Sequence, residues 1–390
     1  MNSGQYVFSQ LSSFIRRYEF NKIVDKYKGN YRVKSFNCWQ QFLCMFYGQI
    51  THRESLRDVV STLHAHRSKW YHLGIKSHIA LSTLADANAN RDWRIWAELA
   101  RLLIGEARQL YVDDPDFEIN IDHTIYVIDT TTIDLCLSLF PWAKFRKTKA
   151  AVRLHTVMDL RGAISVFIWI TDGKVHETNM LDRIGFEARA FYIMDRGFLD
   201  FKRLYAMEQQ DAYFVVRARK ILNYRRIYSQ PVDKSKGLRC DQIGKLTGFY
   251  PLKYYPDKIR RIKCYDKQPN KYIVLLTNNF ELDPYLICEL YRCRWHIELF
   301  FKWIKQNLKI KVYWGQSANA VKSQIWIAIA SYVLVAIIKK KLNIRLSLYE
   351  ILQILSVSVF DKTPVNQLLK KQNLQKPMPP NYNQLNIFDL

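Results

Sequence analysis

The sequence predicts a mixed α/β protein, with helices at both ends of the chain and strands in its middle. From Tyr6 to about Tyr111, apolar residues recur every three or four positions, which is the period of an amphipathic helix. Between residues 125 and 217, short apolar runs alternate with Gly, Asp and Lys turns, which is typical of strands. Beyond Leu282 the helical period returns. Together these observations favour an α/β or α+β arrangement over an all-helical one.

Residues 1–115 are predicted to form an all-helical N-terminal domain. Within it, a helix is expected over Ser55–Leu63, a break at Gly74, and a second helix whose N-cap is Ser82 with Thr83. Two short helices around a glycine in a basic protein fit a DNA-binding helix-turn-helix. An ordinary helical bundle explains the same pattern and is the favoured interpretation.

Residues 116–310 are predicted to form the central domain, after the turn-rich Asp113–Asp116. Its expected strands are IYVIDTTTI, AVRLHTVMDL, ISVFIWIT, FYIMDRGF and AYFVVRAR. Residues 220–270 are strand-like but irregular, which indicates a β-rich insertion. We expect C-terminal helices over residues 311–370 and a polar tail, rich in Pro, Asn and Gln, over 371–390.

The charge balance indicates a polyanionic partner. Lys and Arg number 59 against 35 acidic residues, giving a formal net charge of +24. Charge alone favours nucleic acid only slightly over a membrane surface or a ribosomal role. The seven cysteines include no C-x-x-C pair, so neither a disulfide framework nor a zinc site is indicated, and a reducing compartment fits best.

No membrane span is expected from the sequence. The first ten residues lack the apolar core of a signal peptide. The most apolar run, Ile325–Ile338, is shorter than the roughly 20 residues that a membrane span requires. We therefore expect a buried helix, ended by Lys339, Lys340 and Lys341, in a cytoplasmic protein.

Two carboxylates directly follow apolar runs in the central domain. Asp129 follows IYVI and Asp195 follows FYIM, and open sheets place their ligands at such strand ends. A single Asp after a strand is more often a turn former. A third acidic residue with matching chemistry is needed before these positions indicate a site.

Glu298 is the candidate third carboxylate. On one continuous helix, Tyr291, Arg294, Glu298, Lys302 and Lys305 fall within an arc of about 80°. The opposite side of this helix is apolar, with Leu290, Ile297, Phe300, Phe301, Ile304 and Leu308. Taken alone, this polar stripe is better explained by a solvated helix surface with i, i+4 ion pairs.

A metal site follows if the three carboxylates lie together, because like charges raise one another's pKa until cations compensate them. Oxygen ligands select Mg²⁺ or Mn²⁺. Two such ions about 4 Å apart suit in-line phosphoryl displacement. Arg and Lys beside them would neutralise phosphates of a DNA backbone.

The stretch from Tyr291 to Lys305 resembles the Y-R-E-K signature of bacterial transposases of the fourth insertion-sequence family. YVIDTTT and FYIMDRGF are similar to the first and second acidic motifs of that family. RYEFNKIVDKY and THRESLRDVV resemble parts of its helical N-terminal region. The resemblance covers most of the chain and implies a ribonuclease-H-like catalytic core, with the β-rich insertion between Asp195 and Glu298.

The resemblance implies a DNA transposase of an insertion sequence. Such an enzyme would cut the element's terminal inverted repeats, pass through a hairpin intermediate and join a 3′-hydroxyl to target DNA. It implies that Asp129, Asp195 and Glu298 are catalytic and bind two Mg²⁺ ions, with Mn²⁺ as a substitute. It also implies a homodimer on paired ends, at the nucleoid of a bacterial cytoplasm.

The same resemblance assigns DNA contacts to Tyr291, Arg294 and Lys305, while Lys302 shares their face without belonging to the signature. The basic run Lys144, Arg146, Lys147 and Lys149 is also expected to contact phosphates, although a solvated hairpin would look the same. Two alternatives remain. One is a related metal-dependent nuclease that never joins strands, and the other is a DNA-binding regulator with an inactive catalytic centre.

Overall fold

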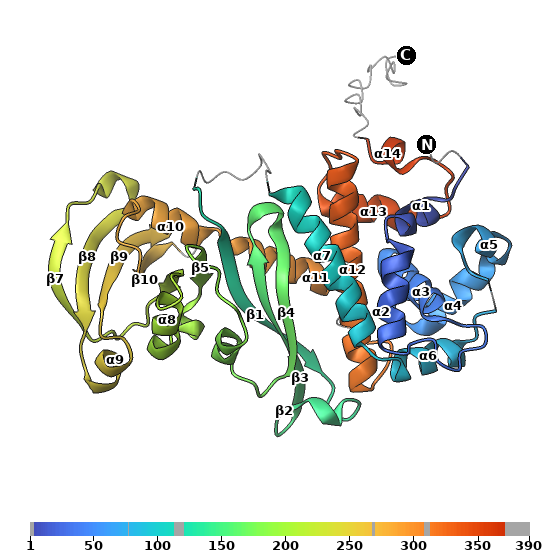
Figure 1. The fold of residues 1–390 in the computed structure, drawn as a ribbon, viewed down its shortest axis with the longest axis horizontal. Helices are drawn as coiled ribbons and strands as arrows, with labels where there is room; N and C mark the ends of the chain where they lie inside the picture. The colour runs from blue at the N-terminus through green and yellow to red at the C-terminus, as the bar shows by residue number, and fades with distance from the viewer. Residues whose placement is uncertain (1–3, 77, 113–120, 267–269, 308–312, 371–390) are drawn as a thin grey trace, which may run out of the picture.

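The computed structural model of the 390-residue chain has a helical body at one end and a large sheet at the other (Figure 1). It describes all residues except 1–3, 77, 113–120, 267–269, 308–312 and 371–390. The predicted mixed α/β class is confirmed. The expected turn at Asp113–Asp116 and the polar tail lie outside the described residues.

The N-terminal part is helical throughout, as predicted. Its α-helices are α1 (Val7–Ser13), α2 (Arg17–Lys26), α3 (Cys38–Ile50), α4 (Leu56–Ala65), α5 (Trp70–Leu73), α6 (Leu81–Asn90) and α7 (Arg94–Tyr111). The start of α3 is fixed by a capping box, in which the side chain of Asn37 accepts from the backbone N–H of Gln40 and that of Gln40 accepts in return. Phe20, Phe42 and Trp96 stack in the core between α2, α3 and α7.

The two expected helices around Gly74 are α4 and α6, which pack against each other. A short 3₁₀ helix (Arg67–Lys69) and α5 lie between them, so they are not joined by a simple glycine turn. Gly74 ends α5 with a φ of 79°, which favours glycine. The expected N-cap was wrong, because Ser82 and Thr83 lie inside α6 and Ala80 takes the cap position.

In the part of the chain that the structure describes, the strands form one ten-stranded mixed sheet. They are β1 (Ile125–Leu135), β2 (Lys144–Arg146), β3 (Lys149–Asp159), β4 (Ile164–Asp172), β5 (Phe191–Met194), β6 (Tyr213–Arg217), β7 (Tyr224–Gln230), β8 (Leu238–Leu246), β9 (Lys258–Asp266) and β10 (Lys271–Thr277). The order is β2-β3-β1-β5-β6-β10-β9-β8-β7, and β4 also pairs with β3. Each predicted strand run is present.

Five of these strands have the arrangement of a ribonuclease-H-like core. β1, β3 and β4 form an antiparallel meander, and β5 and β6 add to the other side of β1 in parallel. The link from β5 to β6 is α8 (Phe201–Glu208), a crossover helix of the kind that parallel strands require. The strands of residues 220–270 extend this same sheet through β10, which pairs antiparallel with β6 on one side and with β9 on the other.

The two faces of the sheet are buried in separate cores. Ile125 and Val127 of β1 face the core shared with the helical body, whereas Tyr126 and Ile128 face α8. This alternation follows from the two-residue period of a strand. Side chains of odd-numbered β1 residues therefore point to the face that α10 (Pro284–Arg292) and α11 (Trp295–Asn307) also contact.

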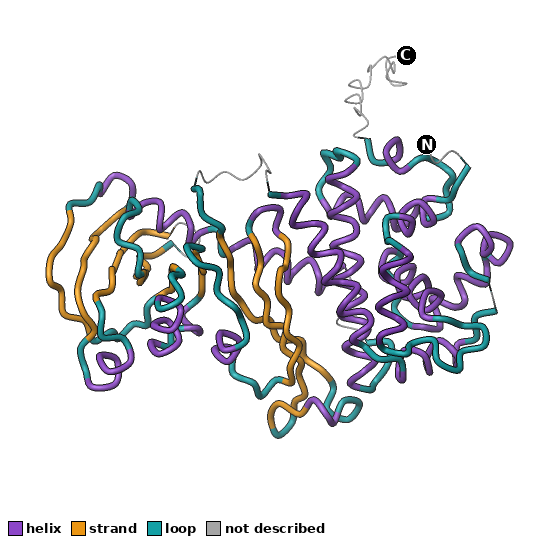
Figure 2. The backbone as a smooth tube through the Cα atoms, viewed as in Figure 1, coloured by secondary structure: helices purple, strands orange, loops and turns teal. Residues whose placement is uncertain are grey.

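The C-terminal helices are α12 (Ala318–Lys341), α13 (Leu348–Ser358) and α14 (Val365–Leu368). α12 packs against α3, α6 and α7, so both ends of the chain build one helical body (Figure 2). Backbone bonds from Val7 to Asp361 and from Phe8 to Val359 join the ends directly.

In the described parts of the chain, α12 alone is long and apolar enough to cross a membrane, by length and composition. It is longer than the apolar run suggested, with 24 residues. As predicted, it is buried, since 94% of its most apolar window lies inside the fold.

Candidate active site

Asp129 and Asp195 occupy neighbouring positions on two parallel strands. The ladder between β1 and β5 ends with the pair Ile128 and Met194, and each carboxylate is the next residue. The sequence predicts a strand end at Asp129, but β1 continues to Leu135, where it still pairs with β3. The ladder with β5, rather than the strand itself, ends at this point.

Arg217 stands in the same row and was missed by sequence reasoning. The ladder between β5 and β6 ends with Met194 and Val216, so Arg217 follows on β6 as Asp195 follows on β5. The available signal was the apolar run YFVV, which Arg217 ends just as Asp195 ends FYIM. All three charged residues share the odd-numbered face of their strands, which α10 and α11 cover.

The expected single helix over residues 291–306 is two helices. α10 ends at Arg292 and α11 begins at Trp295, with Cys293 and Arg294 in a turn between them. The stripe therefore does not lie on one straight surface. Tyr291 is buried at the end of α10, and its hydroxyl donates a hydrogen bond to Asp195 Oδ1 at 3.1 Å.

Arg294 joins the first carboxylate to the third. Its Nη1 donates to Asp129 Oδ2 at 3.3 Å, and its Nη2 donates to Glu298 Oε1. About a fifth of the Arg294 and Asp129 side chains is exposed, against 37% for Glu298. The structure thus brings Asp129, Asp195 and Glu298 to one edge of the sheet, linked through Arg294 and Tyr291.

The electrostatics of this cluster follow from its burial. Burial raises the pKa of Asp129 to about 6; Arg294 and the backbone N–H of Thr130 oppose this rise, while the other two carboxylates add to it. Burial opposes the charge of the Arg294 guanidinium, but Tyr291, Asp129 and Glu298 together raise its pKa above the ordinary value. The site therefore holds an excess of negative charge that Arg294 compensates.

The two lysines of the predicted stripe lie differently. Lys305 donates to the backbone carbonyl of Thr132 at 2.9 Å, which joins α11 to β1 beside Asp129. Lys302 is exposed. The apolar side of the stretch is confirmed, since Leu290, Ile297, Phe300, Phe301 and Ile304 are all buried, whereas Leu308 lies outside the described residues.

The basic run lies at the tip of the hairpin formed by β2 and β3. The side chains of Lys144, Arg146, Lys147 and Lys149 are all exposed. The hairpin continues the ladder beyond the carboxyl half of β1, because Leu135 pairs with Ala150. It is a solvated cationic hairpin near the same strand that carries Asp129.

Other titratable residues near the site have structural contacts. His155 lies opposite Thr130 and bonds to its hydroxyl and to that of Thr171, and burial lowers its pKa to about 4. Asp159 lies at the opposite end of the β1 ladder and pairs with Arg108. These residues stand outside the carboxylate cluster.

The donor set fits a hard divalent cation, since it consists of carboxylate oxygens, which Mg²⁺ and Mn²⁺ prefer. Within the described residues, no three His, Cys, Asp or Glu side chains are already arranged to hold one ion. Instead, the Arg294 guanidinium compensates two of the carboxylates. The fit of this site to a divalent cation therefore rests on the carboxylate chemistry of its side chains.

Fold and site together define a class of enzyme with acidic residues at the carboxyl edge of a ribonuclease-H-like sheet. Comparison with known families supplies the particular family. A model described as a transposase DDE domain matches residues 120–334, more than half of the chain, and a domain of unknown function (DUF4372) matches residues 3–76. The chain belongs to the DDE transposase family, whose enzymes act on DNA and generally depend on divalent metal ions.

Individual relatives agree with this assignment. A protein of Sinorhizobium fredii described as the transposase y4zB is 28% identical over 72% of this chain and 78% of its own length. A Geobacillus stearothermophilus protein described as the transposase for insertion sequence element IS5377 is 26% identical over 57% of this chain and 59% of its own. Membership of the fourth insertion-sequence family, as read from the Y-R-E-K spacing, stays a prediction.

One solved structure was also matched. The piggyBac transposase synaptic complex with hairpin DNA aligns with a TM-score of 0.44 and 12% identity, over 95% of this chain and 81% of that chain. A likeness of this size carries no argument about the present chain.

Proposed function

We propose that this protein is an insertion-sequence transposase that cuts DNA at the element's ends and joins the freed 3′-hydroxyl to target DNA. The observation that carries the proposal is the convergence of Asp129, Asp195 and Glu298 at one sheet edge, in a chain of the DDE transposase family. Cut-and-paste movement through a hairpin intermediate, on a homodimer that pairs two ends, completes the proposal.

The three carboxylates would hold two Mg²⁺ ions, which when bound activate the attacking oxygen and stabilise the leaving one. Neighbouring side chains of this chain position the three carboxylates. Tyr291 orients Asp195 through its hydroxyl, and the Arg294 guanidinium donates to both Asp129 and Glu298 and so holds these two carboxylates near each other. Lys305 helps to hold α11, the helix that carries Glu298, against β1 through its bond to the Thr132 carbonyl.

DNA contacts are proposed for Tyr291, Arg294, Lys302 and Lys305 next to the reacting phosphate. Lys302 is exposed beside Glu298 and is free to neutralise a phosphate. The cationic hairpin with Lys144, Arg146, Lys147 and Lys149 would hold the DNA backbone farther along β1.

The test uses the full chain and a DNA fragment that carries the genomic sequence on both sides of its gene. With Mg²⁺ and a supercoiled target plasmid, we expect nicking at the element end, followed by products in which the end is joined to the plasmid. With EDTA in place of Mg²⁺, both products should be absent. Cleavage without joined products would favour the nuclease alternative instead, and binding without cleavage would favour the regulator.

A hairpin variant tests the DNA path separately. Changing Lys144, Arg146, Lys147 and Lys149 together to Gln should lower the slope of log affinity against log salt concentration by about 3 to 4, because each phosphate contact contributes about 0.9. The measurement is fluorescence anisotropy with end DNA at several salt concentrations. An unchanged slope would mean that the hairpin is only a solvated surface.

A further inference from the structure

Arg217 lies in the same row as Asp129 and Asp195, one strand farther along the sheet. Each of the three is the next residue after the last ladder pair that joins β1, β5 and β6. Because neighbouring strands are about 4.8 Å apart, the backbone of Arg217 lies about 5 Å from that of Asp195 and about 10 Å from that of Asp129. Asp195 therefore has a carboxylate residue on one side and an arginine on the other.

The side chain of Arg217 points to the face of the sheet that carries the carboxylates. Arg217 is paired with Leu275 of β10, and directly opposed residues of an antiparallel pair share a face. Leu275 belongs to the core that the odd-numbered residues of β1 also face. On this face α10 packs over β5 and β6, and Tyr291 near its end bonds to Asp195. The Arg217 side chain therefore begins between α10 and the sheet.

The charge of Arg217 acts on the hydroxyl that orients Asp195. Burial, followed by the negative charge of Asp195, raises the pKa of the Tyr291 hydroxyl, whereas the positive charges of Arg294 and Arg217 oppose this rise. The same hydroxyl donates to Asp195 Oδ1. Two guanidiniums, one from the turn before α11 and one from β6, therefore lie close enough to influence one group of the site.

The Arg217 guanidinium is unpaired in the part of the chain that the structure describes. Its side chain is half-buried, yet it makes no hydrogen bond or ion pair with any described residue. Arg294, by contrast, donates to Asp129 and Glu298, and Lys305 donates to a backbone carbonyl. The donors of Arg217 are therefore available to a ligand, whereas those of Arg294 are already shared between two carboxylates.

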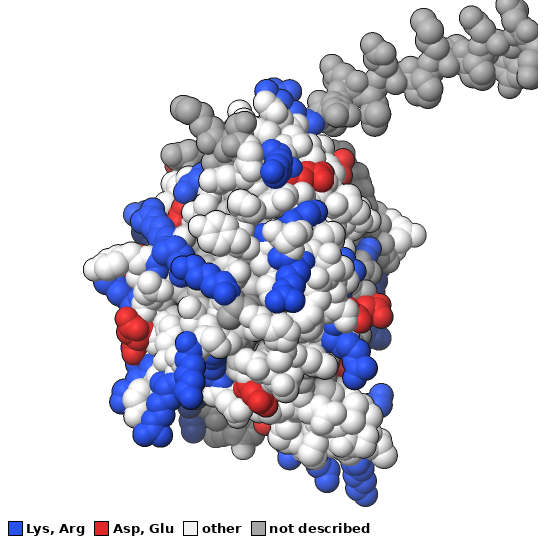
Figure 3. All heavy atoms as spheres, turned by 90° about the vertical axis from the view of Figure 1, so that its right-hand side faces the viewer, with Lys and Arg blue, Asp and Glu red and all other residues white. Residues whose placement is uncertain are grey.

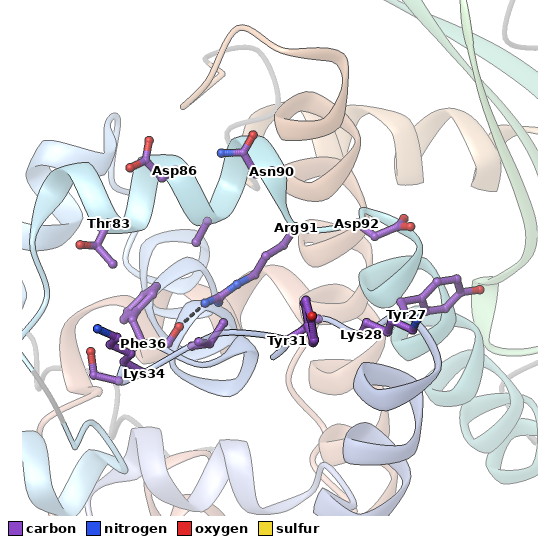
Figure 4. Close-up of a pocket in the computed structure, with 14 residues that line it drawn as sticks. Tyr27, Lys28, Tyr31, Lys34, Phe36, Thr83, Asp86, Asn90, Arg91 and Asp92 are labelled. Atoms are coloured by element: carbon purple, nitrogen blue, oxygen red, sulfur yellow. Dashed lines mark hydrogen bonds between the residues drawn. The ribbon is translucent and has the colours of Figure 1, made fainter.

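Other half-buried arginines of the fold do have partners. Arg91, which follows α6, donates to the backbone carbonyl of Phe36 (Figure 4), and Arg203 of α8 pairs with two aspartates. Exposed cations need no partner because water solvates them, and Lys and Arg side chains of this kind are spread over the end of the helical body (Figure 3). Arg217 has lost part of its hydration without gaining an acceptor, which is unfavourable. A ligand with oxygen acceptors would supply what Arg217 lacks.

A phosphodiester is the oxyanion that fits this position. The planar fork of a guanidinium matches two phosphate oxygens, and such charge-assisted bonds are strong. We infer that Arg217 donates to the non-bridging oxygens of the DNA phosphate that is cleaved, on the side of Asp195 away from Asp129. The contact stabilises the negative charge that these oxygens carry in the transition state. This inference rests on the proposed function and adds a catalytic residue to it.

Arg217 acts in this reaction as a fixed charge and exchanges no proton. In cleavage, a water oxygen forms a bond to phosphorus, and the bond from phosphorus to the 3′ oxygen breaks. The water gives up one proton, and the departing 3′ oxygen takes one up. In joining, the freed 3′-hydroxyl takes the place of water, and a phosphodiester of the target is broken. The non-bridging oxygens carry negative charge in both reactions, so one guanidinium serves both.

The contact itself is measured by binding, without catalysis. Full-length protein in EDTA is titrated with two end-DNA duplexes, of which one has an uncharged methylphosphonate in place of the phosphate at the cleavage point. The ratio of the two affinities isolates the contribution of that one phosphate charge. From the native chain to Arg217→Gln, the preference for the natural duplex should fall about tenfold, as expected for one charge-assisted contact. An unchanged ratio would overturn the inference.

The cleavage rate with Mg²⁺ at saturating protein is the second measurement. Arg217→Gln should cut natural end DNA about a hundredfold more slowly than the native chain, because one donor to the reacting oxyanion is lost. Arg217→Lys keeps the charge without the fork and should have an intermediate rate. The matched control is Arg189→Gln, which removes an exposed charge just before β5, at the end of the strand opposite Asp195. The control should cut at the native rate, and native-rate cleavage by Arg217→Gln would contradict the inference.

A purely structural role of Arg217 gives a different result. Arg217→Gln should unfold at the native urea concentration, because no partner within the described structure is lost. If this variant cut slowly while its affinity ratio stayed native, Arg217 would position its neighbours rather than touch the phosphate, and the inference would be wrong. If it did not fold, Arg217→Lys takes its place in the binding measurement, where the ratio should fall about threefold, and an unchanged ratio again overturns the contact.

Failure of this inference and failure of the proposed function give different results. If native protein cuts end DNA and Arg217→Gln matches it in rate and in affinity ratio, the phosphate contact is wrong and the enzyme stands. If the affinity ratio falls as expected but native protein never cuts, the phosphate contact stands and the catalytic proposal falls.

Discussion

Glu298→Gln is expected to abolish cleavage of end DNA, by more than about a hundredfold, while leaving DNA binding at the native level. Glutamine has the shape of glutamate and keeps an oxygen that can accept from Arg294 Nη2, so the local packing is retained. What is lost is the negative charge that a divalent cation requires. The measurement is Mg²⁺-dependent cleavage of labelled end DNA, next to anisotropy binding of the same DNA.

Glu289→Gln is the matched control for this prediction. Glu289 lies on α10, close in sequence to Tyr291, but pairs with Arg292 rather than with the cluster. It should cut at the native rate. Native-rate cleavage by Glu298→Gln would contradict the role of the third carboxylate. If the native chain and both variants bind and none cuts with Mg²⁺ or Mn²⁺, the regulator interpretation replaces the enzyme.

The second large effect concerns stability. Asp241 of β8 and Arg260 of β9 form a bidentate ion pair, with Nη2 to Oδ2 at 2.7 Å and Nε to Oδ1 at 2.9 Å, and at most 1% of either side chain is exposed. Asp241→Ala leaves the guanidinium buried without its counter-charge. We expect a loss of about 3–5 kcal/mol in the free energy of unfolding, measured by urea denaturation.

Two further variants separate the causes. Arg260→Met with Asp241→Leu removes both charges and should cost much less than the single change, since no unpaired ion remains. Lys22→Gln, which breaks an exposed pair with Glu19, should cost less than about 1 kcal/mol. If Asp241→Ala lowered the free energy of unfolding by less than about 1 kcal/mol, the buried pair would contribute no more to stability than an exposed one.

The Arg260 side chain also contacts the segment that leads to the site. The same guanidinium donates from Nη1 to the carbonyls of Asn279 and Leu282, which lead directly into α10. α10 in turn places Tyr291 against Asp195. The strands of residues 220–270 thus support the helix that completes the carboxylate cluster.

Sequence reasoning reached the strands, the helices and the three acids, because each is marked by its immediate neighbours. Asp195 follows a four-residue apolar run, and Glu298 lies among residues whose apolar side is correctly marked by spacing. It missed the break between α10 and α11 at Cys293 and Arg294. The helical period of the sequence continues through this turn, which only the backbone hydrogen bonds reveal. It also missed Arg217, because a single cation after a strand resembles any surface residue.

The sequence by itself determined most element types and the excess of positive charge, and it marked the three acidic residues that the structure brings together, since these depend on local periodicity and composition. Tertiary structure alone decided that Asp129 and Asp195 are adjacent, because parallel pairing of β1 with β5 joins segments more than sixty residues apart. It likewise decided that α12 belongs to the N-terminal helices rather than to a separate C-terminal unit. Such contacts depend on which apolar faces pack against each other. A periodic pattern shows which face of an element is apolar, but it does not show which other element that face will contact.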